Sequence, residues 1–330
     1  MFPRRVLDGT MKIAIYGAGG VGGYFGGRLA QAGANVHLIA RGEHLSALHE
    51  RGLQVESVHG DFEQDLPATD DPAEIGPCEY VLFCVKSFDT TDAARQLAPL
   101  LNEETAVVSL QNGVTNEEIL AQEIGQEHVL GGVAYIFATI GPPGVIEHTG
   151  GPATIVFGEL DGPRSERAER LLALCERAQG MDAELSTDIQ SVLWEKAAFI
   201  CAQAGMTATV RLPLDKIRST AASWEMYQRI IEEVCAVAAS EDIDLPADTV
   251  ARWMEFAAGL DEDTYSSLHY DMIHGKRMEL DALHRAVIRR GNEHEVAVPM
   301  TEAVYAVLRP WAVRNEERRE RATSENGPET

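Results

Sequence analysis

Lysine is scarce in this chain, and negative charge dominates it. Five of the 28 basic residues are Lys, at positions 12, 86, 196, 216 and 276, against 52 Asp and Glu, and the formal net charge is −24. This charge argues against a nucleic-acid partner, because phosphates would be repelled. A Lys-poor acidic surface is typical of a salt-rich cytoplasm, since carboxylates stay solvated under strong screening. GC-rich codon bias, in a protein with an ordinary acidic surface, explains the scarcity of lysine equally well.

Long apolar runs are missing as well. No stretch reaches the roughly 18 to 20 uncharged apolar residues that span a bilayer, so we expect no membrane partner. Residues 1–10 contain Pro3, Arg4 and Arg5 but no apolar run, unlike a secretory signal. We expect these residues to be a disordered extension and the protein to be cytoplasmic.

Cysteine and histidine show no metal-binding pattern. The five cysteines are scattered, at 78, 84, 175, 201 and 235, and the ten histidines lack ligand spacing. We therefore expect no metal site and no disulfide framework.

Strand-like and helix-like patterns alternate over the first half of the chain. Strands are expected at 11–16, 35–40, 80–85, 106–110, 128–138 and 153–159, and helices at 24–31, 92–101 and 116–122. This alternation indicates an α/β fold, a Rossmann-type doubly wound parallel sheet with helices on its faces.

From Ser186 onward the apolar positions recur at helical spacing. The segments are 190–210, 222–240, 247–260, 264–291 and 299–312. The sequence thus predicts a Rossmann domain over 11–185 and an all-helical C-terminal domain over 186–312. Residues 313–330 are charged and then polar, which predicts a flexible tail.

A glycine-rich motif, Gly17-Ala18-Gly19-Gly20-Val21-Gly22, directly follows the first strand. In such a motif the first glycine permits a tight turn, the second lets the backbone approach a pyrophosphate, and the third lets helix and strand pack closely. The helix N-terminus then faces the phosphate charge. A purely structural turn is the alternative, but the flanking strand and helix favour a dinucleotide site.

The end of the second strand indicates which dinucleotide binds. NAD-binding folds usually carry Asp or Glu there to bond the ribose 2′-hydroxyl, whereas this strand runs into Arg41. A guanidinium would pair with a 2′-phosphate, which favours NADP(H). The alternative is a solvated loop arginine, and Glu43 nearby weakens the phosphate assignment.

Lys196 lies in the nearly apolar helical stretch 192–200. Reduction of a ketone needs a proton donor for the carbonyl oxygen, and partial desolvation lowers the pKa of a lysine towards working pH. A lysine that extends out of a core helix into water is an equal alternative.

Six segments in order resemble the ketopantoate reductase (2-dehydropantoate 2-reductase) family, from Met11 to the region of Pro310. They are the cofactor loop 12–22, Cys84-Val85-Lys86, Gln111-Asn112-Gly113, the segment 144–150, Leu193-Trp194-Glu195-Lys196, and the C-terminal signature within 266–281.

The resemblance implies a role for each matching residue. Lys196 would be the general acid, and Glu279 would hold the lysine or the forming hydroxyl and contact the cofactor. Ser267 would bind the substrate carboxylate, Asn112 would orient substrate near the nicotinamide, and Lys86 would lie near cofactor and substrate. A cation and neutral donors suit an anionic 2-oxo acid. From the residues alone, Glu279 is more simply a helix-surface carboxylate and Ser267 a helix cap.

One departure concerns the substrate. Family members that act on ketopantoate usually carry Asn four and eight residues after the catalytic lysine, where this chain has Ile200 and Ala204. The loss should weaken binding of a hydroxylated substrate by roughly 1 kcal/mol or more per hydrogen bond. Gln203 and Thr207 are the candidates for compensation.

We therefore expect an NADPH-dependent reductase of a small 2-oxo acid, with ketopantoate, a precursor of coenzyme A, as first candidate. A reductase of a more apolar 2-oxo acid stays open, and so does a non-catalytic NADPH sensor. The retained Lys196 and Glu279 argue against the sensor. The sequence does not give the oligomeric state, and a homodimer is an open alternative.

Overall fold

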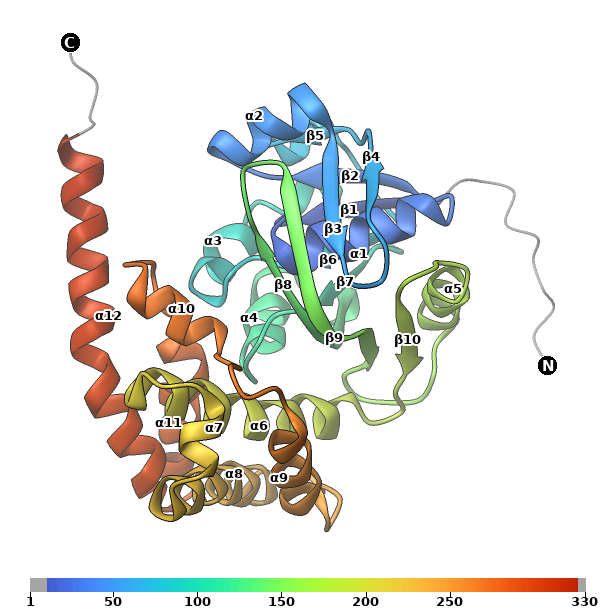
Figure 1. Ribbon diagram of the computed structural model, residues 1–330. Helices are drawn as coiled ribbons and strands as arrows, with labels where there is room; N and C mark the ends of the chain where they lie inside the picture. Colours follow the sequence, from blue (N-terminus) through green and yellow to red (C-terminus); the bar gives the residue numbers. More distant parts are fainter. Residues whose placement is uncertain (1–10, 326–330) are drawn as a thin grey trace. The chain divides into compact units, whose positions relative to one another are not determined.

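The computed structural model describes residues 11–325 (Figure 1). The chain divides into two compact units. The first runs through Gln111 and resumes from Asn116 to Ile189, and the second comprises Asn112–Thr115 and the chain from Gln190 onward. A short turn from the first half of the sequence thus belongs to the second unit.

The first unit is built on a sheet with ten strands in the described part of the chain, in the order β4-β3-β9-β8-β7-β6-β1-β2-β5, with β10 beside β9. The strands are β1 Lys12–Tyr16, β2 Asn35–Ile39, β3 Leu53–Ser57, β4 Phe62–Gln64, β5 Ala68–Thr69, β6 Tyr80–Phe83, β7 Ala106–Ser109, β8 Val129–Ile140, β9 Val145–Glu159 and β10 Asp182–Leu185. The predicted doubly wound, mainly parallel sheet is confirmed. The pairs β8–β9 and β3–β4 are antiparallel.

Strand β1 lies in the interior of this sheet because it is apolar on both faces. Ile13 and Ile15 are fully buried, and Tyr16 pairs with Ile39 on one side and Phe83 on the other. The chain leaves β1 towards β2 and later returns to its opposite side as β6. The carboxyl end of β1 is therefore a topological switch point, where α/β sheets of this kind place ligands.

Helices and 3₁₀ turns connect these strands. The helices are α1 Gly20–Gln31, α2 Gly42–Arg51, α3 Thr90–Ala94, α4 Asn116–Ile124 and α5 Glu166–Cys175, and the 3₁₀ turns are η1 Pro72–Glu74, η2 Ser87–Asp89, η3 Ala98–Leu100 and η4 Gln126–His128. The expected helix at 92–101 is broken into α3 and η3, because Pro99 lacks the N–H that a continuous helix needs.

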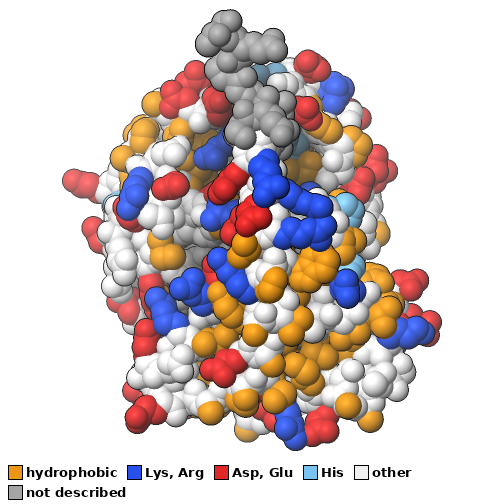
Figure 2. Space-filling view, turned by 90° about the vertical axis from the view of Figure 1, so that its left-hand side faces the viewer, with side chains coloured by type: hydrophobic (Ala, Val, Ile, Leu, Met, Phe, Trp, Pro, Cys, Tyr) orange, Lys and Arg blue, Asp and Glu red, His pale blue; other side chains and the backbone are white. Residues whose placement is uncertain are grey.

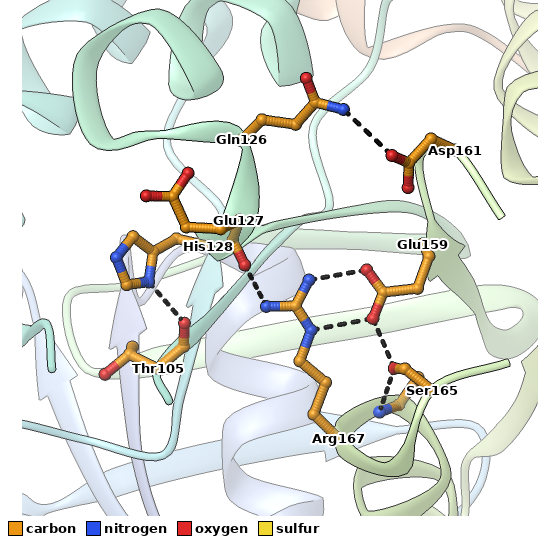
Figure 3. Close-up of polar contacts among 9 residues, drawn as sticks. Thr105, Gln126, Glu127, His128, Glu159, Asp161, Ser165 and Arg167 are labelled. Carbon is orange, nitrogen blue, oxygen red and sulfur yellow. Dashed lines mark hydrogen bonds and ion pairs between the residues drawn. The ribbon is translucent and has the colours of Figure 1, made fainter. Parts of the chain in front are cut away.

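Polar contacts stabilise the other end of the strands, where the parallel strands begin (Figure 3). Arg167 donates to both carboxylate oxygens of Glu159 at 2.8 and 2.6 Å, and the pair lowers the pKa of Glu159 although burial opposes this. A hollow of about 230 Å³ at this end is lined by Tyr80, Asn102 and Arg170, among others, and contains none of the predicted site residues.

The second unit is helical in the described residues. Its elements are α6 Ile189–Val210, α7 Leu214–Arg218, α8 Ala221–Ser240, α9 Thr249–Gly259, α10 Ser267–Ile273, the π-helical turn η5 Asp281–Arg285, α11 Ala286–Glu293 and α12 Pro299–Glu325. Its core joins α6 to α8, where Tyr227, Ile230 and Val234 are fully buried. None of the described helices is both long and apolar enough to cross a membrane.

Several element predictions need correction. The structure adds α2, β3, β4, β5, α5 and β10, which had no distinct pattern, and it starts β9 at Val145 rather than 153. The expected helical segment 264–291 is interrupted after α10, where Gly275 has φ +67°.

The expected flexible tail over 313–330 is also wrong for its first part. Helix α12 continues to Glu325, and side chains such as Arg321 and Glu317 pair along it at 3.8 Å. Figure 2 shows basic and acidic side chains close together on the face that it draws. Residues 326–330, and the extension expected at 1–10, lie outside the described residues.

Candidate active site

The glycine loop joins the carboxyl end of β1 to α1. Gly17 has φ +100°, and a Cβ there would lie 2.9 Å from the backbone nitrogen of Val85. A Cβ on Gly22 would lie 2.2 Å from the carbonyl oxygen of Gly17. At Gly19, by contrast, the nearest atom to a Cβ would be Ile140 Cδ1 at 3.9 Å. A Cβ on Gly20 would lie 2.3 Å from the carbonyl oxygen of Ala138, so the loop is tight at Gly17, Gly20 and Gly22 and least crowded at Gly19.

The N-terminus of α1 is suited to an anion. Its cap residue is Gly19, with no capping side chain, and no acidic residue lies in the first turn, which contains Gly20, Val21 and Gly22. Unpaired N–H groups and the helix dipole leave such an end positive. The backbone of Ala18 is fixed by its N–H, which donates to the carbonyl oxygen of Ile39 at 3.0 Å. These residues fit the pyrophosphate of a dinucleotide.

Arg41 lies just beyond the carboxyl end of β2, at the N-cap of α2, and is exposed. Burial raises the pKa of Tyr16, the last residue of β1, and the positive charge of Arg41 opposes this rise. The Tyr16 hydroxyl itself donates to Gln96 Oε1 at 3.1 Å. Because Tyr16 directly precedes Gly17, this electrostatic effect indicates that Arg41 lies near the glycine loop, on the side of β2.

Lys86 lies on the other side of this loop, after β6, and is exposed. Gln111, a buried residue that sequence reasoning named without a role, holds this strand end. Its side-chain amide donates to the carbonyl oxygen of Val85 at 2.9 Å and to the hydroxyl of Thr90 at 2.8 Å. The Gln-Asn-Gly motif that contains it was the signal in the sequence.

Asn112 is half-buried and belongs to the second unit, with the rest of its turn up to Thr115. Arg290 of α11 donates to the carbonyl oxygen of Val114 at 3.0 Å and pairs with Glu241 at 2.7 Å. Sequence reasoning missed Arg290, because nothing in the pattern of α11 marks it as a partner of a turn so distant in sequence.

Lys196 occupies the middle of α6 and is 6% exposed. All five lysines lie within the described residues, and the other four are half-buried or exposed. The neighbouring Glu195 is half-buried and pairs with Arg252 of α9. The structure thus gives Lys196 a buried position that the surface-lysine alternative does not explain.

Ile200 and Ala204 share the face of α6 that carries Lys196, since residues four apart lie one above the other. Ala204 is buried and Ile200 half-buried. Gln203 accepts a hydrogen bond from Tyr227 at 3.1 Å, and its amide nitrogen is buried with no hydrogen-bond partner in the described chain. Thr207 donates to the carbonyl oxygen of Gln203 at 2.6 Å.

The C-terminal signature places two adjacent serines differently. Ser266 caps α10, accepting from the N–H of His269 at 3.1 Å, and lies 2.7 Å from the Thr207 hydroxyl. Ser267 is exposed on the first turn of α10 and is not the cap. Glu279 is 7% exposed and directly precedes Leu280 and the π-helical turn η5. It is not a helix-surface carboxylate.

The candidate residues fall into two groups. Gly17 to Gly22, Arg41 and Lys86 surround the carboxyl end of β1 in the first unit, and Asn112, Lys196, Ser267 and Glu279 belong to the second. No cluster of three or more His, Cys, Asp or Glu in residues 11–325 could hold a metal ion.

Family models match both parts of the chain. The model of ketopantoate reductase PanE/ApbA matches residues 13–162, and the model of its C-terminal part matches residues 188–312. The chain belongs to the ketopantoate reductase family. The ketopantoate reductases are oxidoreductases, so the chain is an oxidoreductase by family.

Individual proteins resemble the chain over nearly its whole length. The uncharacterized oxidoreductase YkpB of Bacillus subtilis is 33% identical over 307 residues, which are 91% of this chain and 99% of that protein. The crystal structure of a PanE/ApbA family ketopantoate reductase from Ralstonia eutropha has a TM-score of 0.85 at 33% identity and covers 93% of this chain and 100% of its own.

A further solved structure shows the same fold with a nicotinamide cofactor. It is the ternary complex of a D-mandelate dehydrogenase with NADH and anilino(oxo)acetate, with a TM-score of 0.85 at 24% identity, covering 93% of this chain and 99% of its own.

Proposed function

We propose that this chain is an NADPH-dependent 2-dehydropantoate 2-reductase, which reduces ketopantoate to pantoate for coenzyme A biosynthesis. The observation that carries the proposal is the burial of Lys196 on the apolar helix α6. Burying an ammonium group is costly, so a lysine in this position is best explained by a task there.

The glycine loop supports a dinucleotide in the first unit. A Cβ at Gly19 would contact only Ile140 Cδ1, at 3.9 Å, and the uncapped N-terminus of α1 offers N–H groups to a pyrophosphate. Arg41 beside Tyr16 would pair with the 2′-phosphate of NADPH. When bound, the reduced nicotinamide supplies the hydride that adds to the keto carbon.

The residues of the second unit supply the acid and the anchors. Lys196 would give a proton to the keto oxygen as negative charge develops there, and would regain it from water. Glu279 would hold the ammonium or the new hydroxyl in place. Ser267 would bind the substrate carboxylate, and Asn112 and Lys86 would orient substrate and cofactor.

A second candidate substrate is a more apolar 2-oxo acid. Ile200 and Ala204, on the Lys196 face of α6, offer no hydrogen bond to a hydroxyl group. The buried amide nitrogen of Gln203, which has no hydrogen-bond partner in the described residues, is the donor that favours ketopantoate instead.

A matched pair of substrates tests both. Ketopantoate and 3,3-dimethyl-2-oxobutanoate differ only in the 4-hydroxyl group, so NADPH oxidation should be followed with each, at low and at high salt. A higher kcat/KM for ketopantoate supports the pantoate reaction. A higher kcat/KM for 3,3-dimethyl-2-oxobutanoate supports the second candidate, a reductase of more apolar 2-oxo acids.

Absence of turnover with any 2-oxo acid would reject both enzyme assignments. Tight NADPH binding without turnover would then identify the non-catalytic sensor. The variant Lys196→Ala is the control, because it should abolish turnover in an enzyme and leave NADPH binding intact.

A further inference from the structure

His44 contacts the glycine loop from α2. Its Nε2 lies 2.8 Å from the carbonyl oxygen of Ala18. Its Nδ1 accepts a hydrogen bond at 3.0 Å from the N–H of Gly144, in the turn between β8 and β9. One imidazole thus joins three parts of the first unit: helix α2, the glycine loop and the β8–β9 turn.

These two contacts determine where the ring carries its proton. Because the N–H of Gly144 can only donate, Nδ1 must be unprotonated. Burial lowers the pKa of His44 below its usual value, so the ring is neutral near pH 7. Nε2 therefore bears the single proton and donates it to the carbonyl oxygen of Ala18.

The contact with Ala18 also orients the next N–H group. A trans peptide is planar, and its C=O and N–H point in opposite directions. With its oxygen directed at His44, the Ala18–Gly19 peptide turns the N–H of Gly19 to the other side. This N–H donates to no group within the described residues, and a Cβ at Gly19 would meet no atom closer than Ile140 Cδ1, at 3.9 Å.

We propose that His44 is a positioning residue of the cofactor site, which holds the Ala18–Gly19 peptide so that the N–H of Gly19 is presented to the dinucleotide pyrophosphate. The inference rests on the proposed function, because it takes the glycine loop as the nucleotide site. His44 acts through the backbone of the loop and does not touch the reacting atoms.

The fold does not depend on His44 alone. Arg51, also in α2, donates to the carbonyl oxygen of Pro143 at 3.0 Å and holds the same turn. The loop itself is also fixed by the N–H groups of Gly17 and Ala18, which share the carbonyl oxygen of Ile39 at 3.1 and 3.0 Å. Replacement of His44 should therefore leave the first unit folded.

Two amide substitutions separate the two contacts of the ring. Glutamine places its amide nitrogen where Nε2 lies in histidine, whereas asparagine places its amide group near Nδ1. His44→Gln should keep the donor to Ala18, and His44→Asn should lose it while keeping an acceptor for Gly144. The matched control is His49→Gln, since His49 lies in the same helix and contacts the carbonyl oxygen of Ala68 at 2.7 Å.

The experiment measures the Kd of NADPH by titration calorimetry, with the Tm of each variant and, where turnover is found, the KM for NADPH and kcat. For His44→Asn we expect Kd and KM to rise about tenfold, as for one lost hydrogen bond, with Tm and kcat unchanged. His44→Gln and His49→Gln should bind as the wild type does.

Any other result contradicts either the positioning role of His44 or the proposed function. Equal binding by wild type and His44→Asn rejects the positioning role while the nucleotide site stands. Equal losses in all three variants, or a loss matched by a fall in Tm, reject it in favour of a structural role for α2. A wild-type protein that binds neither NADPH nor NADH rejects the proposed function itself.

Discussion

His284 Nε2 lies 3.0 Å from the carbonyl oxygen of Cys201, a residue of the same helix that carries Lys196. The histidine is fully buried, and a Cβ on Gly205 would come within 2.5 Å of its ring, so glycine at 205 makes room for it. The π-helical turn that begins two residues after Glu279 is thereby fastened to α6.

This histidine predicts a loss of stability in acid. Burial lowers the pKa of His284 to about 4 in the folded protein, from 6.5. Below pH 6.5 the unfolded chain takes up a proton that the folded protein does not, so stability is fully present above 6.5 and falls towards pH 4. The fall should approach roughly 3 kcal/mol. Urea unfolding from pH 7 to 4 measures it, and an unchanged slope in His284→Gln would contradict the assignment.

Replacement of Lys196 should remove catalysis without removing the cofactor. Lys196→Gln keeps a polar side chain of similar length but cannot act as an acid at neutral pH. We expect kcat to fall by about 10² to 10⁴, with the Kd of NADPH within about twofold of the wild type. Single-turnover rates and calorimetry measure the two quantities. Retention of full kcat would remove Lys196 from the chemistry.

Two glycines of the cofactor loop should respond in opposite ways to alanine. Gly22→Ala brings a methyl group to 2.2 Å from the carbonyl oxygen of Gly17, so the protein should lose about 1 to 3 kcal/mol of stability. In Gly19→Ala the nearest protein atom to the new Cβ would be Ile140 Cδ1, at an ordinary contact distance of 3.9 Å. This variant should keep its Tm and bind NADPH at least tenfold more weakly. Unchanged affinity in Gly19→Ala would place the pyrophosphate elsewhere.

Arg41 should determine the preference of the protein for NADPH over NADH. Its charge-assisted hydrogen bonds to a 2′-phosphate should contribute about 1.5 to 3 kcal/mol. Arg41→Gln should therefore weaken NADPH binding by about tenfold or more and leave NADH binding nearly unchanged. Competitive titrations with both nucleotides give the ratio. If both weaken equally, Arg41 acts on the loop through Tyr16 and not on the phosphate.

The elements that frame the cofactor loop could be predicted because each is apolar and bounded by clear signals. Strands β1 and β2 and the glycine turn followed directly from such patterns. Strands β3, β4 and β5 could not, because they are short, and exposed polar residues such as Glu56 and Glu63 interrupt them. The helical course of 313–325 was missed because a charged segment without an apolar stripe resembles a disordered one.

The site was predicted unevenly for a similar reason. Gly17, Lys196 and Glu279 belong to motifs, and motifs are local in sequence. His44 and Arg290 act through backbone carbonyl groups of residues distant in sequence, and a contact of this kind leaves no spacing pattern in the sequence. The alternative role given to Ser267, that of a helix cap, belongs to Ser266. The sequence alone does not distinguish the two, because either of two adjacent serines can cap a helix.

The turn Asn112–Thr115 affects how the protein can be made. Its anchor, the hydrogen bond between Arg290 and the carbonyl oxygen of Val114, joins residues 176 positions apart. During synthesis on the ribosome, the strands up to β10 can pair before α11, which carries Arg290, has been made. Until then the carbonyl oxygen of Val114 lacks this hydrogen bond. A polypeptide released after residue 189 would carry the turn without its partner. Neither unit can therefore be obtained intact by a single cut in the chain.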